Sequence, residues 1–213
     1  ANTLQLQGSN NNTTYGGNAA RIEAGGSQSI TYGGGSLAIT MYGGTGTATY
    51  GGSSYDDGVL VCATCATYNE AQIRSVGNQT VNATSIAITG GGGGNGNWAG
   101  IESKSTSSVV ASGAITITGG ASGGAYFAGP DGYVSNDAGI SADGALSVTA
   151  GSIVLAGGAA DYGGAYIGGS SSVTVNTTGN LTLTGGSTAA QGAALTYANA
   201  SPATLKWLAP AII

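Results

Sequence analysis

The feature that most constrains the fold of this 213-residue chain is a short motif, apolar-x-apolar-x-Gly-Gly, that recurs along it. Four clear copies are present, at 86–91, 115–120, 153–158 and 181–186. Two weaker copies lie nearer the N-terminus, at 4–6 and 37–39. Between copies come an Ala-x-Ile or Ala-x-Leu segment and, eight residues after its apolar residue, a Val-centred segment, as at Ile73 and Val81. A constant offset of this kind predicts stacked structural repeats.

Each repeat contains three short runs in which apolar and small polar residues alternate, so that one set faces inward and the other outward. Glycine contributes 42 residues and costs about 1 kcal/mol at each interior helix position, which disfavours helices. Two-residue Asn-Gly or Asp-Gly turns do not systematically separate the runs, so equivalent strands are expected to pair in parallel from repeat to repeat. We therefore predict an all-β fold: a single parallel β-helix (β-solenoid) of about six three-stranded coils of roughly 28 residues, with corner insertions.

The predicted β-solenoid covers residues 1–197, with insertions at about 44–69 and 119–137. Residues 198–213 break the repeat and form the most apolar segment. This tail is predicted either to cap its own last coil or to dock on the next subunit. The candidate docking residues are Trp207, Leu208, Ile212 and Ile213.

The charge composition excludes several classes of protein. Charged residues make up 6% of the chain, against about 25% in a typical globular protein. Four Lys and Arg residues at a net charge of −5 cannot supply a nucleic-acid-binding face. The absence of histidine excludes histidine triads and histidine metal sites. No apolar run is long enough for a membrane-spanning helix, and no cofactor or metal site is expected.

The remaining charged residues do not indicate an enzyme. The carboxylates are spread along the chain. The sequences around Asp131, Asp137 and Asp143 are typical of turns, so a role in turn formation is favoured over calcium binding. Arg21 and Arg74 flank core isoleucines and are expected to be solubilising surface charges. We therefore predict no catalytic residues, although clustered carboxylates on one face would favour an enzyme acting on polysaccharides.

Aromatic residues gather in and between the two insertions, which leave the predicted solenoid at the same corner. These candidate contacts for a ligand or partner are Tyr50, Tyr55, Tyr68, Trp98, Tyr126, Phe127 and Tyr133. Exposed aromatic rings among polar neighbours suit stacking on sugars or contact with a protein. The alternative, that they cover the edge of the solenoid as part of a satellite core, is equally compatible with the sequence. Cys62 and Cys65 form a C-x-x-C motif and are predicted to be joined by a local disulfide.

Repeats such as 114–120 and 179–186 resemble those of filamentous-haemagglutinin-type adhesins, which are large secreted bacterial β-helix proteins of two-partner secretion and autotransporter systems. The resemblance covers about residues 71–197. It implies a right-handed parallel β-helix, a location outside the cell or on its surface, and an adhesive or fibre-forming role. The chain is much shorter than those proteins and lacks their N-terminal secretion domain, so it is expected to be a fragment or a small relative.

These observations predict a non-enzymatic extracellular structural and adhesive protein that forms or belongs to a surface fibre, such as those of biofilms. Its expected partners are further copies of itself, stacked end to end, and a glycan or other cell-surface ligand. Two alternatives remain open at this stage: a monomeric carbohydrate-binding adhesin segment, and an enzyme acting on polysaccharides.

Overall fold

A computed structural model describes most of the chain, and the residues that it describes form strands and no helix. The described residues are 2–10, 19–32, 34–45, 52–56, 59–65, 69–93, 97–122, 136–159, 163–186, 193–197 and 205–208. Four of these segments are described by their backbone alone: 52–56, 59–65, 193–197 and 205–208. Within the described part of the chain there is consequently no helix that could cross a membrane.

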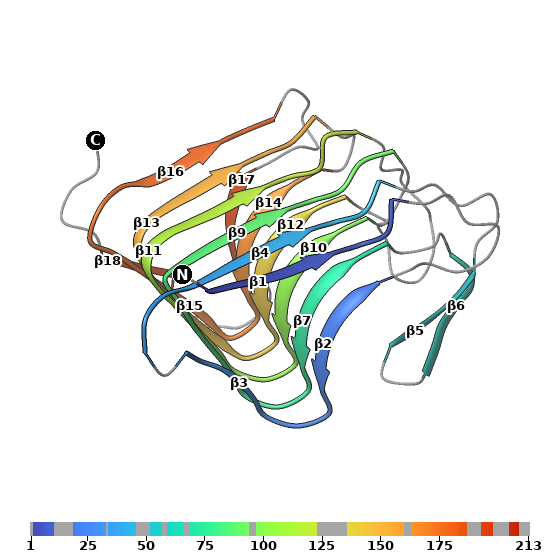
Figure 1. The fold of residues 1–213 in the computed structure, drawn as a ribbon, viewed down its shortest axis with the longest axis horizontal. Coiled ribbons are helices and arrows are strands. Elements are labelled where there is room, and N and C mark those ends of the chain that lie inside the picture. The colour runs from blue at the N-terminus through green and yellow to red at the C-terminus, as the bar shows by residue number, and fades with distance from the viewer. Residues whose placement is uncertain are drawn as a thin grey trace.

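Parallel strands form two sheets, of ten and six strands (Figure 1). The six-stranded sheet contains β2 (Ala20–Ala24), β7 (Ala71–Ser75), β10 (Ala99–Ser103), β12 (Ala138–Ala142), β14 (Ala165–Gly169) and β17 (Ala193–Tyr197). The ten-stranded sheet contains β1 (Asn2–Gln7), β3 (Gln28–Ile30), β4 (Leu37–Tyr42), β8 (Gln79–Ala83), β9 (Ser85–Thr89), β11 (Ser107–Thr118), β13 (Ala145–Ala156), β15 (Ser172–Thr177), β16 (Leu181–Thr184) and β18 (Leu205–Leu208).

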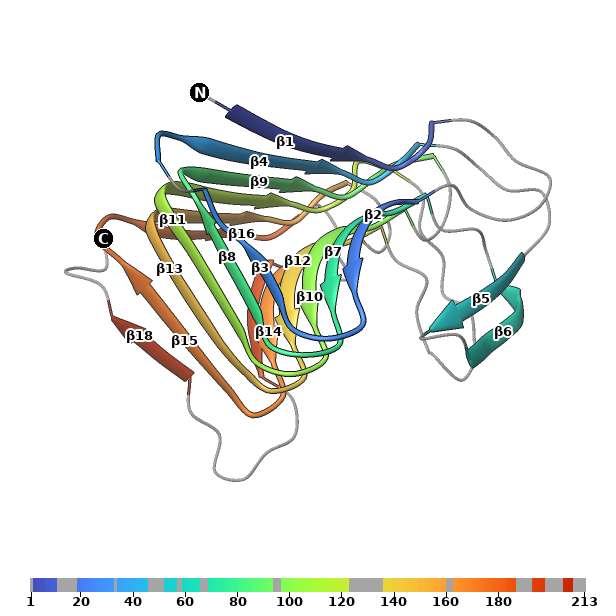
Figure 2. The ribbon, with the colours of Figure 1, turned by 60° about the horizontal axis from the view of Figure 1, so that its bottom comes forward.

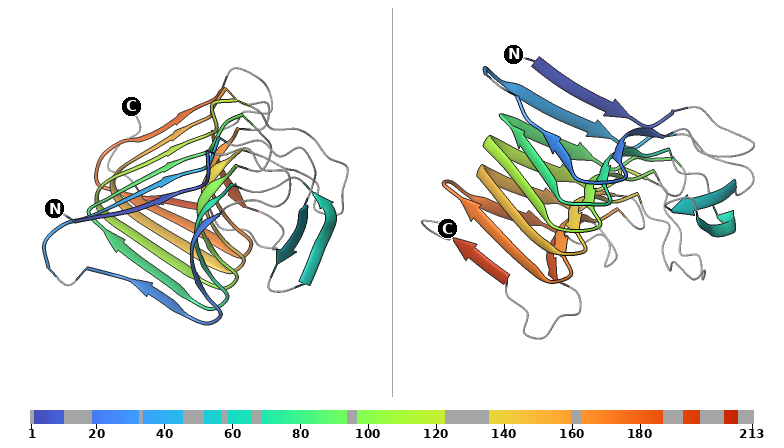
Figure 3. Two further views of the ribbon diagram at one scale, coloured as in Figure 1. Left: turned by 45° about the vertical axis from the view of Figure 1, so that its right-hand side comes forward. Right: turned by 90° about the horizontal axis from the view of Figure 1, so that it is seen from below.

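The chain passes repeatedly from one sheet to the other, and each strand pairs with its equivalent in the next repeat. Within the six-stranded sheet, for example, Ile73 lies beside Ile101, and Ile101 lies beside Ile140. The strand colours therefore run in order from the N-terminal to the C-terminal end of the stack (Figures 2 and 3). The repeat offset in the sequence thus specifies the parallel register.

The predicted β-helix of six coils with three separate strands each is wrong, because the parallel strands belong to two sheets. In β11 and again in β13, two segments that were predicted to be separate strands form one continuous strand of 12 residues. The register between them shifts only between Ala111 and Ala114. Small residues at this position, Ser112 and Gly113, let the ladder continue through a bulge where the sequence predicted a corner.

The sequence prediction also missed an antiparallel hairpin. It is formed by β5 (Gly52–Asp56) and β6 (Val59–Cys65), within the predicted insertion at 44–69. The two strands form a separate two-stranded sheet, which Figure 1 shows beside the two larger sheets. Asp57 and Gly58 lie between the two strands in the sequence, and this dipeptide is a recognised hairpin signal.

The core consists of rows of apolar side chains that cross the sheets from strand to strand. One row in the ten-stranded sheet runs through Leu6, Met41, Ile88, Ile117, Leu155 and Leu183. Met41, Ile88, Ile117 and Leu155 are fully buried. Burial of such side chains contributes roughly 1.5–3 kcal/mol each, which makes these rows the main source of stability.

Buried asparagines join successive repeats just before the strands of the six-stranded sheet. Asn69, Asn97 and Asn136 occupy equivalent positions, and none is exposed. The backbone N–H of Asn97 donates to Oδ1 of Asn136 at 2.9 Å, and Nδ2 of Asn136 donates to the carbonyl oxygen of Ser122 at 2.7 Å. These bonds satisfy polar groups that would be costly to bury unpaired, and they hold the Gly-Gly corner against the next repeat.

Candidate functional site

In the part of the chain that the structure describes, both ends of the stack present strands that are paired on one side only. Among the described residues, β1, β2 and β3 form the N-terminal end and pair with β4, β7 and β8. At the other end, β16, β17 and β18 pair with β13, β14 and β15. Unpaired edges of this kind are templates for the addition of further strands.

Apolar side chains at these ends are less buried than their equivalents inside the stack. Leu4, Ile22 and Ile30 are only partly buried. At the C-terminal end, Leu183 is 44% exposed, whereas Leu155, its neighbour in the same row, is fully buried. Each end therefore exposes part of the hydrophobic core.

The backbone of β1 also has hydrogen-bonding groups at its open edge. The N–H of Asn2 donates to the carbonyl oxygen of Ser36 and that of Gly8 to the carbonyl oxygen of Tyr42, each at 2.9 Å. Bonding alternates along a parallel ladder, so the N–H of Gln5 points away from β4 and toward the edge.

Charged side chains gather on the outward face of the six-stranded sheet. Three of the chain's four Lys and Arg residues lie there, together with four of its nine carboxylates. They are Arg21, Arg74, Lys104, Glu23, Glu70, Glu102 and Asp143. We call this group the charged cluster. Only the sheet brings it together, since its members span residues 21–143 of the sequence.

Ion pairs link the charged cluster from strand to strand. Arg74 lies between Glu23 and Glu102, at 3.5 and 3.6 Å. Nζ of Lys104 lies 2.8 Å from Oε1 of Glu102, and Arg21 lies 2.7 Å from Glu70. The side chain of Arg74 is only 6% exposed, which corrects the prediction that it is a solubilising surface charge. These carboxylates contact cations of their own chain, an arrangement that ties neighbouring strands together.

Glu70 is a buried carboxyl group of the charged cluster. Its pKa is raised above the ordinary value because burial removes water from the carboxylate. Arg21, by its charge and hydrogen bond, and a hydrogen bond from Trp98 act in the opposite direction, while Glu102 adds repulsion. Among the described residues no group of three or more Asp, Glu, Cys or His side chains is placed to hold a metal ion.

Replacing Glu70 with glutamine is expected to change how stability depends on pH. With a raised folded-state pKa, the native state binds more protons than the unfolded state as the pH rises above about 4.5, so stability falls with pH through that window. As the pH rises above about 4.5, the variant Glu70→Gln should lose less stability than the unmodified protein. Arg21→Gln should lose more, because without Arg21 the pKa of Glu70 is raised further. Urea unfolding between pH 4 and pH 8 measures this, and parallel profiles for all three proteins would contradict it.

Most of the aromatic residues predicted to contact a ligand lie outside the described residues, namely Tyr50, Tyr68, Tyr126, Phe127 and Tyr133. Tyr55 lies in β5, of which only the backbone is described. Trp98 is described and partly buried. Its ring lies over Gly100, where an added Cβ would come within 1.9 Å of Cζ3. Tyr166 covers Gly139 on the same face in the same way.

The other predicted site residues also lie largely in undescribed parts. Ile212 and Ile213 are not described, and Trp207 and Leu208 belong to β18, whose backbone extends the ten-stranded sheet beside β15. Cys62 and Cys65 both lie in β6, described by its backbone alone. Residues three apart in a regular strand are about 10 Å apart, so the predicted disulfide would need the strand to bend between them.

The sequence analysis did not predict the charged cluster, although the sequence contains a pattern that indicates it. Glu23, Arg74 and Glu102 each follow the isoleucine of an Ala-x-Ile segment, and the repeat offset aligns these three positions on neighbouring strands. Alternating charge at equivalent positions of successive repeats predicts a ladder of ion pairs.

Comparisons of the chain with models of known protein families, with curated proteins and with solved structures gave no match.

Proposed function

We propose that the protein is a non-enzymatic structural and adhesive protein outside the cell, whose copies associate head to tail into a fibre. The observation that carries the proposal is the pair of open, partly apolar ends of the parallel sheets. The resemblance of its repeats to those of filamentous-haemagglutinin-type adhesins supports the extracellular location and the adhesive role.

The two ends are compatible with each other. A parallel sheet can be continued in parallel only by a strand that runs in the same direction, and the opposite end of a second copy offers three such strands in the same order. A head-to-tail contact joins the C-terminal end of one copy to the N-terminal end of another. Each pair of copies still has one free end of each kind, so further copies can add and form a filament.

The internal registers specify how the ends would meet. An outward-facing row runs through Gln5, Thr40, Ala87, Thr116, Val154 and Thr182. Continuing this row between copies places Thr182 of one copy beside Gln5 of the next, and Thr184 beside Gln7. Within one copy, Gln5 and Thr182 are separated by five strand spacings, or roughly 24 Å, so they cannot be joined in the same molecule.

Cysteine cross-linking tests this register. In a Cys62→Ser, Cys65→Ser background, Gln5→Cys protein is mixed with Thr182→Cys protein and oxidised mildly. Neighbouring parallel strands are about 4.8 Å apart, within the reach of a disulfide, so a covalent heterodimer is expected. The matched control, Gln5→Cys with Thr184→Cys, is out of register by two residues and should give at least tenfold less heterodimer. Electron microscopy of the unmodified protein at micromolar concentration should show filaments.

Gln5→Pro supplies a second test, because proline removes an N–H at the open edge without breaking a bond to β4. Filaments should disappear in this variant and persist in Gln5→Ala. Monodisperse short particles from the unmodified chain, or equal cross-linking of both cysteine pairs, would overturn head-to-tail assembly. Depolymerisation of a polysaccharide by the pure protein would overturn the non-enzymatic assignment.

A further inference from the structure

A second surface lies along the Gly-Gly corners of the ten-stranded sheet and reaches the N-terminal end of the stack at Gln7 of β1. It is an open groove of about 410 Å³, within the size range of small-molecule sites. Its lining residues are Gln7, Asn10, Tyr42, Gly43, Thr45, Thr89, Gly90, Gly91, Gly92, Gly93, Ala121 and Ser122. All of them belong to the described part of the chain.

The lining of this groove, which we call the glycine groove, is uncharged and combines one aromatic ring with amides and hydroxyls. The side chain of Tyr42 is 40% exposed. Gln7 and Thr89 are its neighbours in register on either side. Among the described residues, the side chains of Gln7 and Tyr42 make no hydrogen bond, so their polar atoms can bind an external group.

The floor of the glycine groove is preorganised. The N–H groups of Gly43, Gly91 and Gly92 donate to the carbonyl oxygens of Thr89, Asn97 and Gly44 at 2.8, 2.6 and 3.1 Å. Asn10 and Ser122 side-chain oxygens accept from the N–H groups of Thr45 and Gly93, at 3.2 and 3.0 Å. A floor of bonded backbone loses little conformational entropy when a ligand binds, which favours affinity.

The pattern of groups favours a sugar chain as the occupant. An exposed tyrosine ring can stack on the C–H face of a pyranose, and flanking amide and hydroxyl groups can bind its hydroxyls. Gln7, Tyr42 and Thr89 repeat at the strand spacing of about 4.8 Å, roughly the length of one pyranose residue in an extended glycan. The absence of charge from the lining favours a neutral glycan over an acidic one.

We propose that the glycine groove binds neutral polysaccharide, with Tyr42 as the stacking residue and Gln7 as a hydrogen-bonding residue. This goes beyond the proposed fibre and does not depend on it, because the groove is formed within one chain. The protein would then attach to a glycan surface along the side of the stack.

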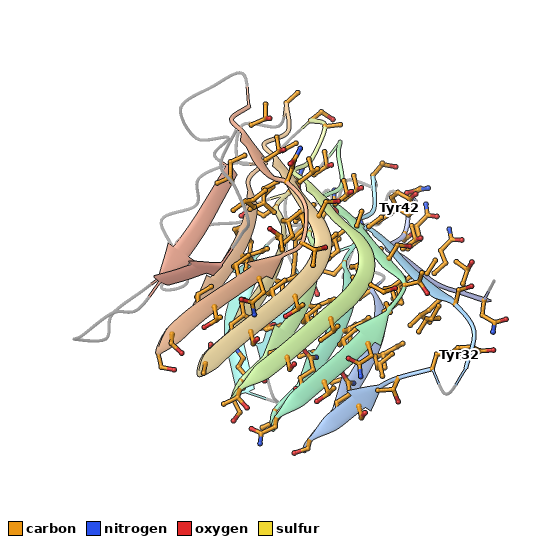
Figure 4. All side chains as sticks on the ribbon, turned by 90° about the vertical axis from the view of Figure 1, so that its left-hand side faces the viewer. Tyr32 and Tyr42 are labelled. Carbon is orange, nitrogen blue, oxygen red and sulfur yellow. The ribbon has the colours of Figure 1, made fainter. Side chains whose placement is uncertain are left out.

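Tyr32 supplies a matched control for Tyr42. Both tyrosines precede two glycines in the sequence, and both are exposed, at 46% for Tyr32 and 40% for Tyr42. Only Tyr42 lines the groove, and the two lie at different places on the surface (Figure 4). If any exposed aromatic ring sufficed for glycan binding, Tyr32→Ala and Tyr42→Ala would weaken it equally. If the groove is the binding site, only Tyr42→Ala should weaken it.

Affinity electrophoresis tests the proposal. The acidic protein, with a net charge of −5, is run in native gels that contain glucomannan, xyloglucan, galactan or dextran, with polygalacturonate as the acidic glycan. At least one neutral polysaccharide should retard the protein. Tyr42→Ala should weaken that binding at least tenfold and Gln7→Ala severalfold, while Tyr32→Ala binds as the unmodified chain does. Thermal unfolding of each variant verifies that it is folded.

Three outcomes would overturn the proposal: no retardation by any of the four neutral polysaccharides, equal retardation of the Tyr42→Ala and Tyr32→Ala variants, or stronger retardation by polygalacturonate. None of these outcomes bears on fibre formation, which the cross-linking and microscopy of the Gln5 and Thr182 variants decide separately.

Discussion

Replacing Gly119 with alanine is expected to destabilise the protein by about 3 kcal/mol or more, the upper range for forcing extra volume into a packed interior. An added Cβ would lie 1.9 Å from the carbonyl oxygen of Gly163 and 2.6 Å from the backbone nitrogen of Gly158. Both are backbone atoms of the following repeat and cannot rotate away as a side chain could. Relief would require the repeats to separate, which strains the bond from the Gly119 N–H to Ala156 at 2.8 Å.

A loss of this size should lower the melting temperature by roughly 6–12 °C in a chain of this length. The control is Gly26→Ala, because no atom lies within 4 Å of an added Cβ at Gly26. That variant should remain within about 1 kcal/mol of the unmodified protein. Equal stability of the two variants would show that close packing is not the reason for the Gly-Gly motif.

Replacing Ile117 with alanine is expected to cost about 2–5 kcal/mol, the usual range for a fully buried aliphatic side chain. Ile117 is unexposed and lies between Ile88 and Leu155 on the neighbouring strands. The backbone ladders on both sides hold the strands at a fixed spacing, so the cavity left by the missing atoms cannot easily close.

Leu183→Ala is the control for Ile117, since Leu183 continues the same row on β16 but is 44% exposed. Measured in dilute protein by chemical denaturation, this variant should lose less than about 1 kcal/mol. A loss as large as that of Ile117→Ala would mean that the C-terminal end is covered in solution, either by the chain itself or by a second copy.

The sequence by itself determined the parallel register. Core residues had to recur at constant offsets so that Ile88, Ile117 and Leu155 could meet across the ladder, and a periodicity of this kind is visible in one dimension. The need for glycine at the corners was also visible, and close packing accounts for it at positions such as Gly119 and Gly158.

Only the tertiary structure decided how many sheets the strands form and which polar groups meet. Whether a corner breaks a ladder depends on backbone angles at two or three small residues, such as Ser112 and Gly113, and either outcome fits the same sequence. Arg74 and Glu102 form an ion pair because neighbouring strands bring them within 4 Å, although they are far apart in the sequence. The surroundings of Tyr42 likewise come from four separate segments that the fold brings together. Periodicity specifies which strands are neighbours, whereas the shape and chemistry of a surface arise from side chains far apart in the sequence.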